Sequence, residues 1–315
     1  MTATTTAPGR VPSRQRVLTV AGTDPTGGAG VAADLKTFAA HGAYGAAVVT
    51  AIVVQDTLDG VRSVHVPPPD VLADQLDAVS GDVALDAVKI GMLGSAENGR
   101  VVAAWLDRLR AADVPASAGP GTVTGRPFVV LDPVLGASVG GARGGALSRD
   151  PAAETLAGLR DVAARADVVT PNLAELGALL GEGVAGDPDA ALAQGVRLAD
   201  RLSSWRPAGH APGRGEVLVL VTGGHLGGDR SPDLLVGPDG VLAVLDGPRL
   251  DVVATHGTGC GLSSALAALR PVRGSWPDAA RDAKEWLTGA LRDGDALVVG
   301  RGTGPVDHLH GLGRP

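Results

Sequence analysis

Short segments that are apolar throughout alternate along this chain with longer segments of helical periodicity. Strands that are apolar on both faces, with helices between them, indicate a mostly parallel sheet covered by helices on each side. We therefore expect an α/β protein. The predicted strands lie at residues 16–21, 46–54, 85–90, 127–131, 167–170 and 216–221, and the predicted helices at residues 31–41, 70–79, 96–111, 151–164, 173–180 and 189–202. Residues 233–236, 241–245 and 250–253 predict a short β-meander.

A glycine loop joins the first predicted strand to the first predicted helix. It reads Gly-Thr-Asp-Pro-Thr-Gly-Gly-Ala-Gly over residues 22–30. A strand, a glycine loop and a helix begin a doubly wound domain, in which ligands bind beyond the carboxyl ends of the strands. The loop lacks the Gly-Lys-Ser/Thr of a Walker A motif, and its glycine spacing does not fit a dinucleotide fingerprint. A tight connection without any ligand is the alternative.

A second glycine turn carries the only cysteine, Cys260. The run Thr-His-Gly-Thr-Gly-Cys-Gly-Leu-Ser-Ser covers residues 255–264, and residues 262–269 read as helix. A turn of this kind, formed here by Gly257, Thr258 and Gly259, points N–H groups outward, and a helix N-terminus attracts negative charge. The same field favours a thiolate at Cys260. These features indicate an anion hole with a base inside it, as phosphoryl transfer needs. The alternative is a small buried apolar cysteine.

Charge and composition exclude several classes of function. The net charge is −7 and no dense cluster of Lys and Arg occurs, which argues against nucleic-acid binding. One cysteine rules out an internal disulfide and fits a reducing cytosol. No uncharged apolar run reaches membrane-spanning length. Aromatic residues make up only 2%, so Ala, Val and Leu must build the core. Residues 1–15 predict a disordered tail, residues 16–311 one domain, and residues 115–126 and 207–214 surface loops.

Further motifs follow in order along the chain. They are residues 31–37, Gly42-Ala43-Tyr44-Gly45, Val49-Thr50-Ala51, Gln55-Asp56-Thr57, Lys89-Ile90-Gly91-Met92-Leu93, Leu131-Asp132-Pro133-Val134, Thr170-Pro171-Asn172-Leu173-Ala174-Glu175, Gly223-Gly224-His225, Ala283-Lys284-Glu285-Trp286-Leu287 and Gly304-Pro305-Val306-Asp307-His308-Leu309-His310. Together with both glycine turns, they resemble the hydroxymethylpyrimidine/phosphomethylpyrimidine kinases of thiamine biosynthesis, which belong to the ribokinase superfamily. The resemblance covers about residues 16–311.

That resemblance implies a three-layer α/β/α fold of the ribokinase type. It also implies ATP-dependent phosphorylation of 4-amino-5-hydroxymethyl-2-methylpyrimidine to the monophosphate and then to the diphosphate. ATP and Mg²⁺ would be required, and a cytoplasmic homodimer would be expected. Most ribokinase relatives carry an aspartate where this chain has Cys260, so the cysteine points to the pyrimidine branch.

The substrate end of the site can be predicted from one carboxamide. A 4-aminopyrimidine offers a ring acceptor beside an N–H donor, and a carboxamide presents the complementary pair. Gln55, just past an apolar strand, is the best-placed carboxamide, although an exposed loop glutamine is the alternative. The resemblance assigns the aminopyrimidine to Gln55 and implies further substrate contacts from Asp34, Ala29, Met92 and Val134.

The phosphate end is predicted at the carboxyl ends of later strands. Asp132 directly follows an apolar strand, and Asn172 and Glu175 would share the first turn of a helix. These oxygen ligands could hold Mg²⁺ through water, with Asp132 and Glu175 as the metal ligands. An N-cap at Asn172 completed by Glu175 is the alternative. Thr222 stands where many relatives have a lysine that would face ATP phosphates, which puts nucleotide affinity in question.

Alternatives to the pyrimidine kinase stay open at this point. A pyridoxal kinase has the same fold and accepts a related hydroxymethyl-pyridine, but it offers Gln55 no matching amino group. A non-catalytic pyrimidine-binding sensor would be compatible with Thr222 and with the altered residues 135–138 that follow Asp-Pro-Val.

Overall fold

The computed structural model describes residues 14–111, 126–136, 147–148, 150, 152–207, 215–224 and 228–312. Most of the predicted tail and of the predicted loops 115–126 and 207–214 lies outside these residues, as do His225 and residues 137–138.

The strands form one sheet in the order β3-β2-β1-β4-β5-β6-β7-β8-β9. Neighbouring strands from β2 to β7 pair in parallel, whereas β3, β8 and β9 pair with their neighbours antiparallel. The mostly parallel sheet that the sequence predicts is therefore confirmed. The strands are β1 (Arg16–Gly22), β2 (Tyr44–Asp56), β3 (Gly60–His65), β4 (Ala87–Ile90), β5 (Phe128–Leu131), β6 (Val168–Val169), β7 (Leu218–Val221), β8 (Asp233–Gly237) and β9 (Gly240–Leu245).

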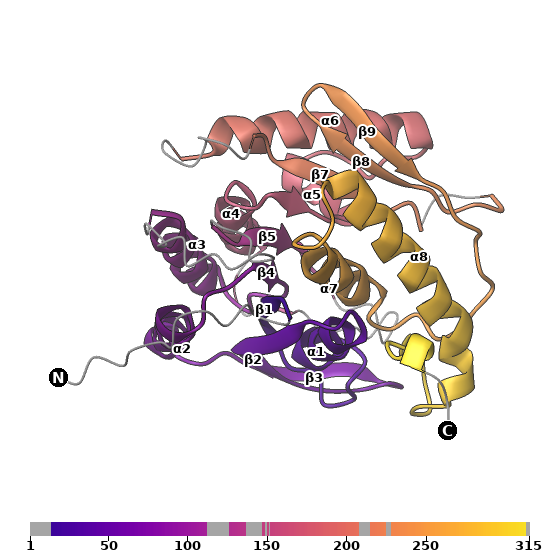
Figure 1. Cartoon of the computed structure of the whole chain (residues 1–315), viewed down its shortest axis with the longest axis horizontal. Coiled ribbons are helices and arrows are strands. Elements are labelled where there is room, and N and C mark those ends of the chain that lie inside the picture. The colour runs from indigo at the N-terminus through magenta and orange to yellow at the C-terminus, as the bar shows by residue number, and fades with distance from the viewer. Residues whose placement is uncertain are drawn as a thin grey trace.

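Helices cover both faces of this sheet, which gives three layers (Figure 1). One face packs against α2 (Pro69–Asp82), α3 (Ala96–Ala111), α4 (Ala152–Ala163), α5 (Leu173–Leu180) and α6 (Pro188–Trp205). The other packs against α1 (Gly30–Ala40), α7 (Thr258–Leu269) and α8 (Trp276–Gly294). Short 3-10 turns at Asp295–Leu297 and His310–Leu312 follow α8.

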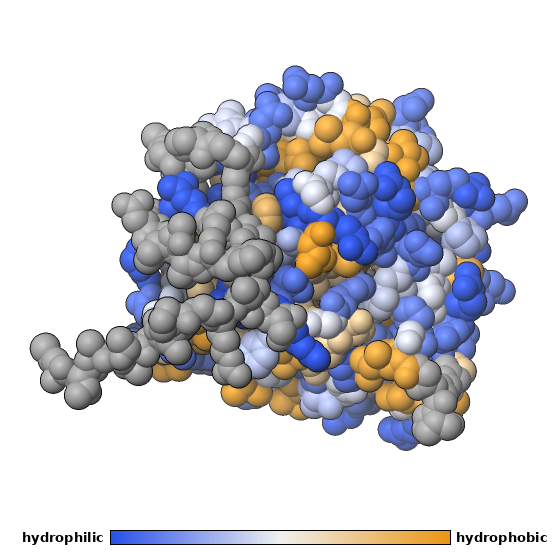
Figure 2. All heavy atoms as spheres, viewed as in Figure 1, coloured by the Kyte–Doolittle hydropathy of each residue, from blue (hydrophilic) through white to orange (hydrophobic). Residues whose placement is uncertain are grey.

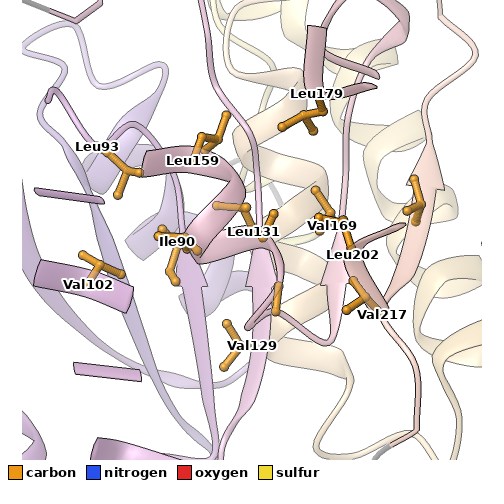
Figure 3. Close-up of a cluster of buried hydrophobic side chains, with 14 of the residues drawn as sticks. Ile90, Leu93, Val102, Val129, Leu131, Leu159, Val169, Leu179, Leu202 and Val217 are labelled. Carbon is orange, nitrogen blue, oxygen red and sulfur yellow. The ribbon is translucent and has the colours of Figure 1, made fainter. Parts of the chain in front are cut away.

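Side chains that alternate along each strand build two cores. On β5, Val129 and Leu131 join the core beneath α2–α6, shown in Figure 3, and Val130 joins the core beneath α1, α7 and α8. This alternation is the reason that the parallel strands must be apolar throughout. The cores consist mainly of Ala, Val and Leu, as the composition requires.

Parallel strands place their carboxyl ends at one edge of the sheet. The chain runs from β1 to β2 on one side and later to β4 on the other, so β1 and β4 flank the topological switch point. Hydrogen bonds continue past the strand ends: the N–H of Asp132 donates to Ile90 O at 2.8 Å, and the N–H of Thr170 donates to Leu131 O at 2.9 Å. The residues that follow these strands are thereby held side by side.

The structure corrects three details of the sequence prediction. The hairpin partner β3 was not predicted, because its charged and polar residues break the apolar pattern. Residues 250–253 form no strand, so the meander has only β8 and β9. Helix α7 begins at Thr258, so Cys260 lies within its first turn.

Strand β9 forms the edge of the sheet, and part of it is uncovered. Its exposed apolar residues are Val241, Leu242 and Val244. Figure 2 shows hydrophobic side chains over the β8–β9 hairpin at the top of this face.

Among the residues that the structure describes, no helix is both long and apolar enough to cross a membrane.

Candidate active site

A cavity of about 770 Å³ opens at the switch point of the sheet, where the carboxyl ends of β1, β4, β5, β6 and β7 meet. Almost every predicted site residue lines it. These residues are Ala29, Gln55, Met92, Asp132, Val134, Asn172, Glu175, Thr222, Gly257, Thr258, Gly259 and Cys260. Asp34 is the exception, because it lies behind the cavity wall with no exposed surface.

The turn before α7 requires glycine at position 257, because the backbone geometry there admits no side chain. Gly257 caps the helix with φ 83°, in the left-handed region that favours glycine. A Cβ atom there would lie 1.8 Å from Gly28 O, so no side chain fits. The first N–H groups of a helix have no partner within it, which leaves those of Gly259 and Cys260 for an anion. The hydroxyl of Thr258 donates to Thr255 O at 2.6 Å and stabilises this turn.

Cys260 is a thiol, not the thiolate that the helix N-terminus led us to expect. Burial raises the pKa of Cys260 to about 12, against the opposing effect of the Lys89 cation, and the carboxylates of Asp132 and Asp34 raise the pKa further. Desolvation and two nearby anions raise the pKa more than the Lys89 cation and the Gly30 N–H lower it. The N–H of Gly30, at the start of α1, also donates to the sulfur, so two helix N-termini meet at this side chain.

Asp34 belongs to a buried ion pair instead of lining the cavity. Its two oxygens lie 2.9 and 3.0 Å from Lys89 Nζ, and both side chains are fully buried. The hydroxyls of Thr19 and Ser264 also donate to Asp34, at 2.5 and 2.7 Å. Attraction to Asp34 outweighs the cost of burial and raises the pKa of Lys89 above its ordinary value. Lys89 lines the cavity floor next to Cys260.

Lys89 was given no role of its own in the sequence prediction. The available signal was a single lysine inside an otherwise apolar strand, since such a charge needs a buried partner. The partner could not be identified from sequence spacing, because Asp34 lies on a different element, α1.

Asn172 and Glu175 form the capping box that was the alternative prediction for them. The side chain of Asn172 accepts from Glu175 N at 3.0 Å, and Glu175 Oε2 accepts from Asn172 N at 3.0 Å. Burial, and then the charge of Asp132, raise the pKa of Glu175 to about 8. Burial also raises the pKa of Asp132, whose Oδ2 accepts from Ser263 Oγ at 3.3 Å. Two neighbouring carboxyl groups whose pKa values are both raised by burial are suited to receive a cation.

These residues could share a metal ion with phosphates but could not enclose one. In the described part of the chain, no group of three or more His, Cys, Asp or Glu side chains could hold a metal by itself. Mg²⁺ commonly takes one or two carboxylates and completes its shell with water and phosphate oxygens. Asp132 and Glu175 fit that pattern.

The end of the cavity that is predicted to hold the substrate is lined mainly by apolar side chains. Val53, Val134, Met92 and Leu147 belong to one small apolar cluster on its wall. Gln55 follows a bulge in β2 and lines the same region. A flat ring with one polar edge suits this arrangement.

The end of the cavity opposite Gln55 contains a cationic side chain, Lys284, to which the sequence prediction gave no role. Thr222 sits there, and its N–H donates to Pro171 O at 3.1 Å. Lys284 of α8 also lines the cavity, with Nζ 2.8 Å from Asp233 Oδ2. Leu262, Leu287 and Leu291 form an apolar wall beside it.

One cavity therefore joins an apolar slot with a carboxamide, an N–H cluster at a helix N-terminus and a pair of carboxyl groups. On a doubly wound sheet of this order, these parts define a small-molecule kinase of the ribokinase type. The chain belongs to the phosphomethylpyrimidine kinase family, whose model matches residues 24–307.

Individual relatives agree with that assignment. The chain is 46% identical over 302 residues to the thiamine biosynthesis multifunctional protein of Corynebacterium efficiens, and the match covers 96% of this chain but only 36% of that longer protein. It is 42% identical over 297 residues to the hydroxymethylpyrimidine/phosphomethylpyrimidine kinase of Salmonella typhimurium, with 94% of this chain and 98% of that protein covered. The solved pyridoxal kinase of Bacillus subtilis, an ADP complex, gives a TM-score of 0.74 at 27% identity, covering 94% and 98% of the two chains.

Proposed function

We propose that this protein phosphorylates 4-amino-5-hydroxymethyl-2-methylpyrimidine with ATP, and then phosphorylates the monophosphate to the diphosphate. The observation that carries this proposal is the single cavity with Gln55 at one end, Cys260 in the middle and Asn172 and Thr222 at the other. The 42% identity to a full-length bifunctional kinase supports the same activity. The proposed setting is the cytoplasm and the proposed assembly a homodimer, which analytical ultracentrifugation would test.

Binding geometry follows from the polar groups of the cavity. Gln55 holds the amino edge of the pyrimidine, and the apolar wall of Met92 and Val134 holds its ring. The hydroxymethyl group then points toward Cys260 and the first turn of α7. The nucleotide lies toward Asn172, Thr222 and Lys284, with its γ-phosphoryl group at the N–H groups of Gly259 and Cys260.

In the first transfer, the substrate hydroxyl attacks the γ-phosphorus as the bond to the ADP oxygen breaks. The N–H groups at the start of α7 stabilise the charge on the transferring group. Only the thiolate form of Cys260, a minor fraction at neutral pH because its pKa is about 12, can take the hydroxyl proton, and it becomes the neutral thiol as the new O–P bond forms. Asp132 and Glu175 would hold Mg²⁺, which would neutralise charge shared between the phosphates.

The second transfer needs Cys260 less. Its nucleophile is a phosphate oxygen that is already anionic, so no proton has to leave. We expect Cys260→Ala to slow the first transfer about 100-fold or more, within the usual range for proton transfer by a side chain, and the second much less. Equal losses in both steps would show that Cys260 only packs against the anion hole.

The direct test is an ATP-consumption assay with products identified by mass spectrometry. Hydroxymethylpyrimidine, its monophosphate and pyridoxal are offered separately. Diphosphate formed from both pyrimidines, with little pyridoxal turnover, is the expected result. Turnover of pyridoxal alone would assign the protein to vitamin B6 chemistry, and binding without turnover would make it a sensor.

A further inference from the structure

The carboxylate of Asp24 lies at the centre of the glycine loop that follows β1. Its Oδ1 accepts from the N–H and the hydroxyl of Thr26, each at 2.8 Å. Its Oδ2 accepts from the N–H groups of Gly28 at 3.1 Å and Ala29 at 2.8 Å. Asp24 is only 5% exposed, yet it lines the cavity.

His256 reaches this carboxylate from the other glycine turn. Its Nε2 lies 2.7 Å from Asp24 Oδ2, across a sequence separation of 232 residues. An ionised carboxylate only accepts hydrogen bonds, so Nε2 must carry the proton. Burial opposes ionisation of Asp24, but hydrogen bonds from His256, Gln55 and Thr26 outweigh it and hold its pKa well below the ordinary value.

Gln55 is the partner of Asp24 whose carboxamide is predicted to hold the substrate ring. Its carboxamide lies beside Asp24 and lines the same cavity. Because Asp24 can only accept, the amide nitrogen of Gln55 must face it, and the amide oxygen must face away. The nitrogen has a second N–H, on the same side as the oxygen. The edge left for a ligand is therefore one acceptor beside one donor.

We propose that Asp24, held in place by His256, is a positioning residue that fixes the amide orientation of Gln55 and so selects a 4-aminopyrimidine over a 4-oxopyrimidine. The 4-amino ring offers a donor beside a ring acceptor and matches this edge. The 4-oxo ring offers an acceptor beside a ring N–H and matches only the reversed amide, which would turn its oxygen toward the Asp24 carboxylate. This selection rests on the proposed function, since it concerns the substrate of that reaction.

The contact between His256 and Asp24 also connects the loop that orients Gln55 to the turn proposed to hold the phosphoryl group. His256 immediately precedes Gly257, which caps α7. Its ring packs against Gly28, where a Cβ atom would lie 2.4 Å from the ring. The loop that orients Gln55 and the turn that holds the phosphoryl group are thus one packed unit.

The test compares kcat/KM for 4-amino-5-hydroxymethyl-2-methylpyrimidine and for its 4-oxo analogue. Asp24→Asn removes the negative charge that opposes the oxygen of a reversed Gln55 amide, and so allows the reversed amide. We expect the preference for the amino substrate to fall about ten- to a hundred-fold, since a bidentate contact discriminates by about that factor. An unchanged preference, with both substrates slowed equally, would overturn the proposal.

A double-mutant cycle separates positioning from a general loss of structure. In Gln55→Ala protein, adding Asp24→Asn should leave the preference unchanged, because the group that it acts through is absent. A further tenfold change there would contradict the proposal. If Asp24→Asn does not fold, Asp24→Ser removes the anion with a smaller side chain and is expected to lower the preference too.

His256 provides matched variants that leave Asp24 intact. Glutamine can keep an N–H near the position of Nε2, so His256→Gln should retain the preference, whereas His256→Ala should lower it. Equal preference in these two variants would remove His256 from the proposal. Wild-type protein that fails to phosphorylate the amino substrate at all would refute the proposed function instead, so the two failures are distinguishable.

Discussion

Glu175 gives a stability prediction whose sign and size follow from its surroundings. The variant is Glu175→Gln, which removes the ionisable group but can still accept the hydrogen bond from Asn172 N. A capping box tolerates Glu or Gln at this place, so the start of α5 should be preserved. Differences between the two proteins then report the carboxyl group itself.

The folded protein binds the Glu175 proton more tightly than the unfolded chain does. Burial and the charge of Asp132 raise its pKa from 4.5 to about 8. A raised pKa contributes stability that is fully present below pH 4.5 and is lost as the pH rises through 8. That shift corresponds to at most about 5 kcal/mol, of which about 3–4 kcal/mol falls between pH 5 and pH 9.

The assay is urea unfolding of both proteins at several pH values in the presence of a chelator. Between pH 5 and pH 9 we expect wild-type protein to lose about 3–4 kcal/mol relative to Glu175→Gln. Mg²⁺ with a non-hydrolysable nucleotide should reduce this difference, because a bound cation favours the ionised carboxyl group. Parallel pH profiles for the two proteins would refute the reasoning.

Other predictions concern the groups around Cys260. Lys89→Met leaves the Asp34 carboxylate buried without a cation, so we expect a loss of about 3–5 kcal/mol in unfolding free energy. Adding Asp34→Asn should recover much of it, and a double variant no more stable than Lys89→Met would contradict the ion-pair account. Cys260 is the only cysteine, so alkylation by iodoacetamide reports it alone. With its pKa at about 12, the rate should rise steadily from pH 7 to pH 10, and a plateau near neutral pH would contradict that value.

The elements of the fold that have a regular apolar pattern were predictable from the sequence. The apolar strands and the helices between them gave a mostly parallel sheet, because side chains on both faces of such strands are buried. The gathering of Asp132, Asn172 and Thr222 was also predictable, since each follows a parallel strand and such strands end at one edge. Strand β3 was not, because an exposed edge strand needs no apolar pattern.

Properties that depend on how deeply a side chain is buried could not be predicted in the same way. A helix N-terminus next to Cys260 suggested a low thiol pKa, but burial and two carboxylates reverse that direction. Asp34 looked like a polar residue of the pocket, but its distance from the cavity surface is set by the packing of α1 against α7. The sequence spacing of these residues carries no information on how deeply each is buried.

The two glycine turns show why similar sequences can have different roles. Both precede a helix and both looked able to bind an anion. The first contains its own anion, Asp24, to which the N–H groups of Gly28 and Ala29 donate hydrogen bonds. The second contains no acidic residue over positions 255–264, so its N–H groups at Gly259 and Cys260 stay directed at the cavity. A glycine turn is therefore a site for an external anion only where no carboxylate of the turn occupies it. In the proposed reaction the phosphoryl group is therefore left with one such position, at the start of α7.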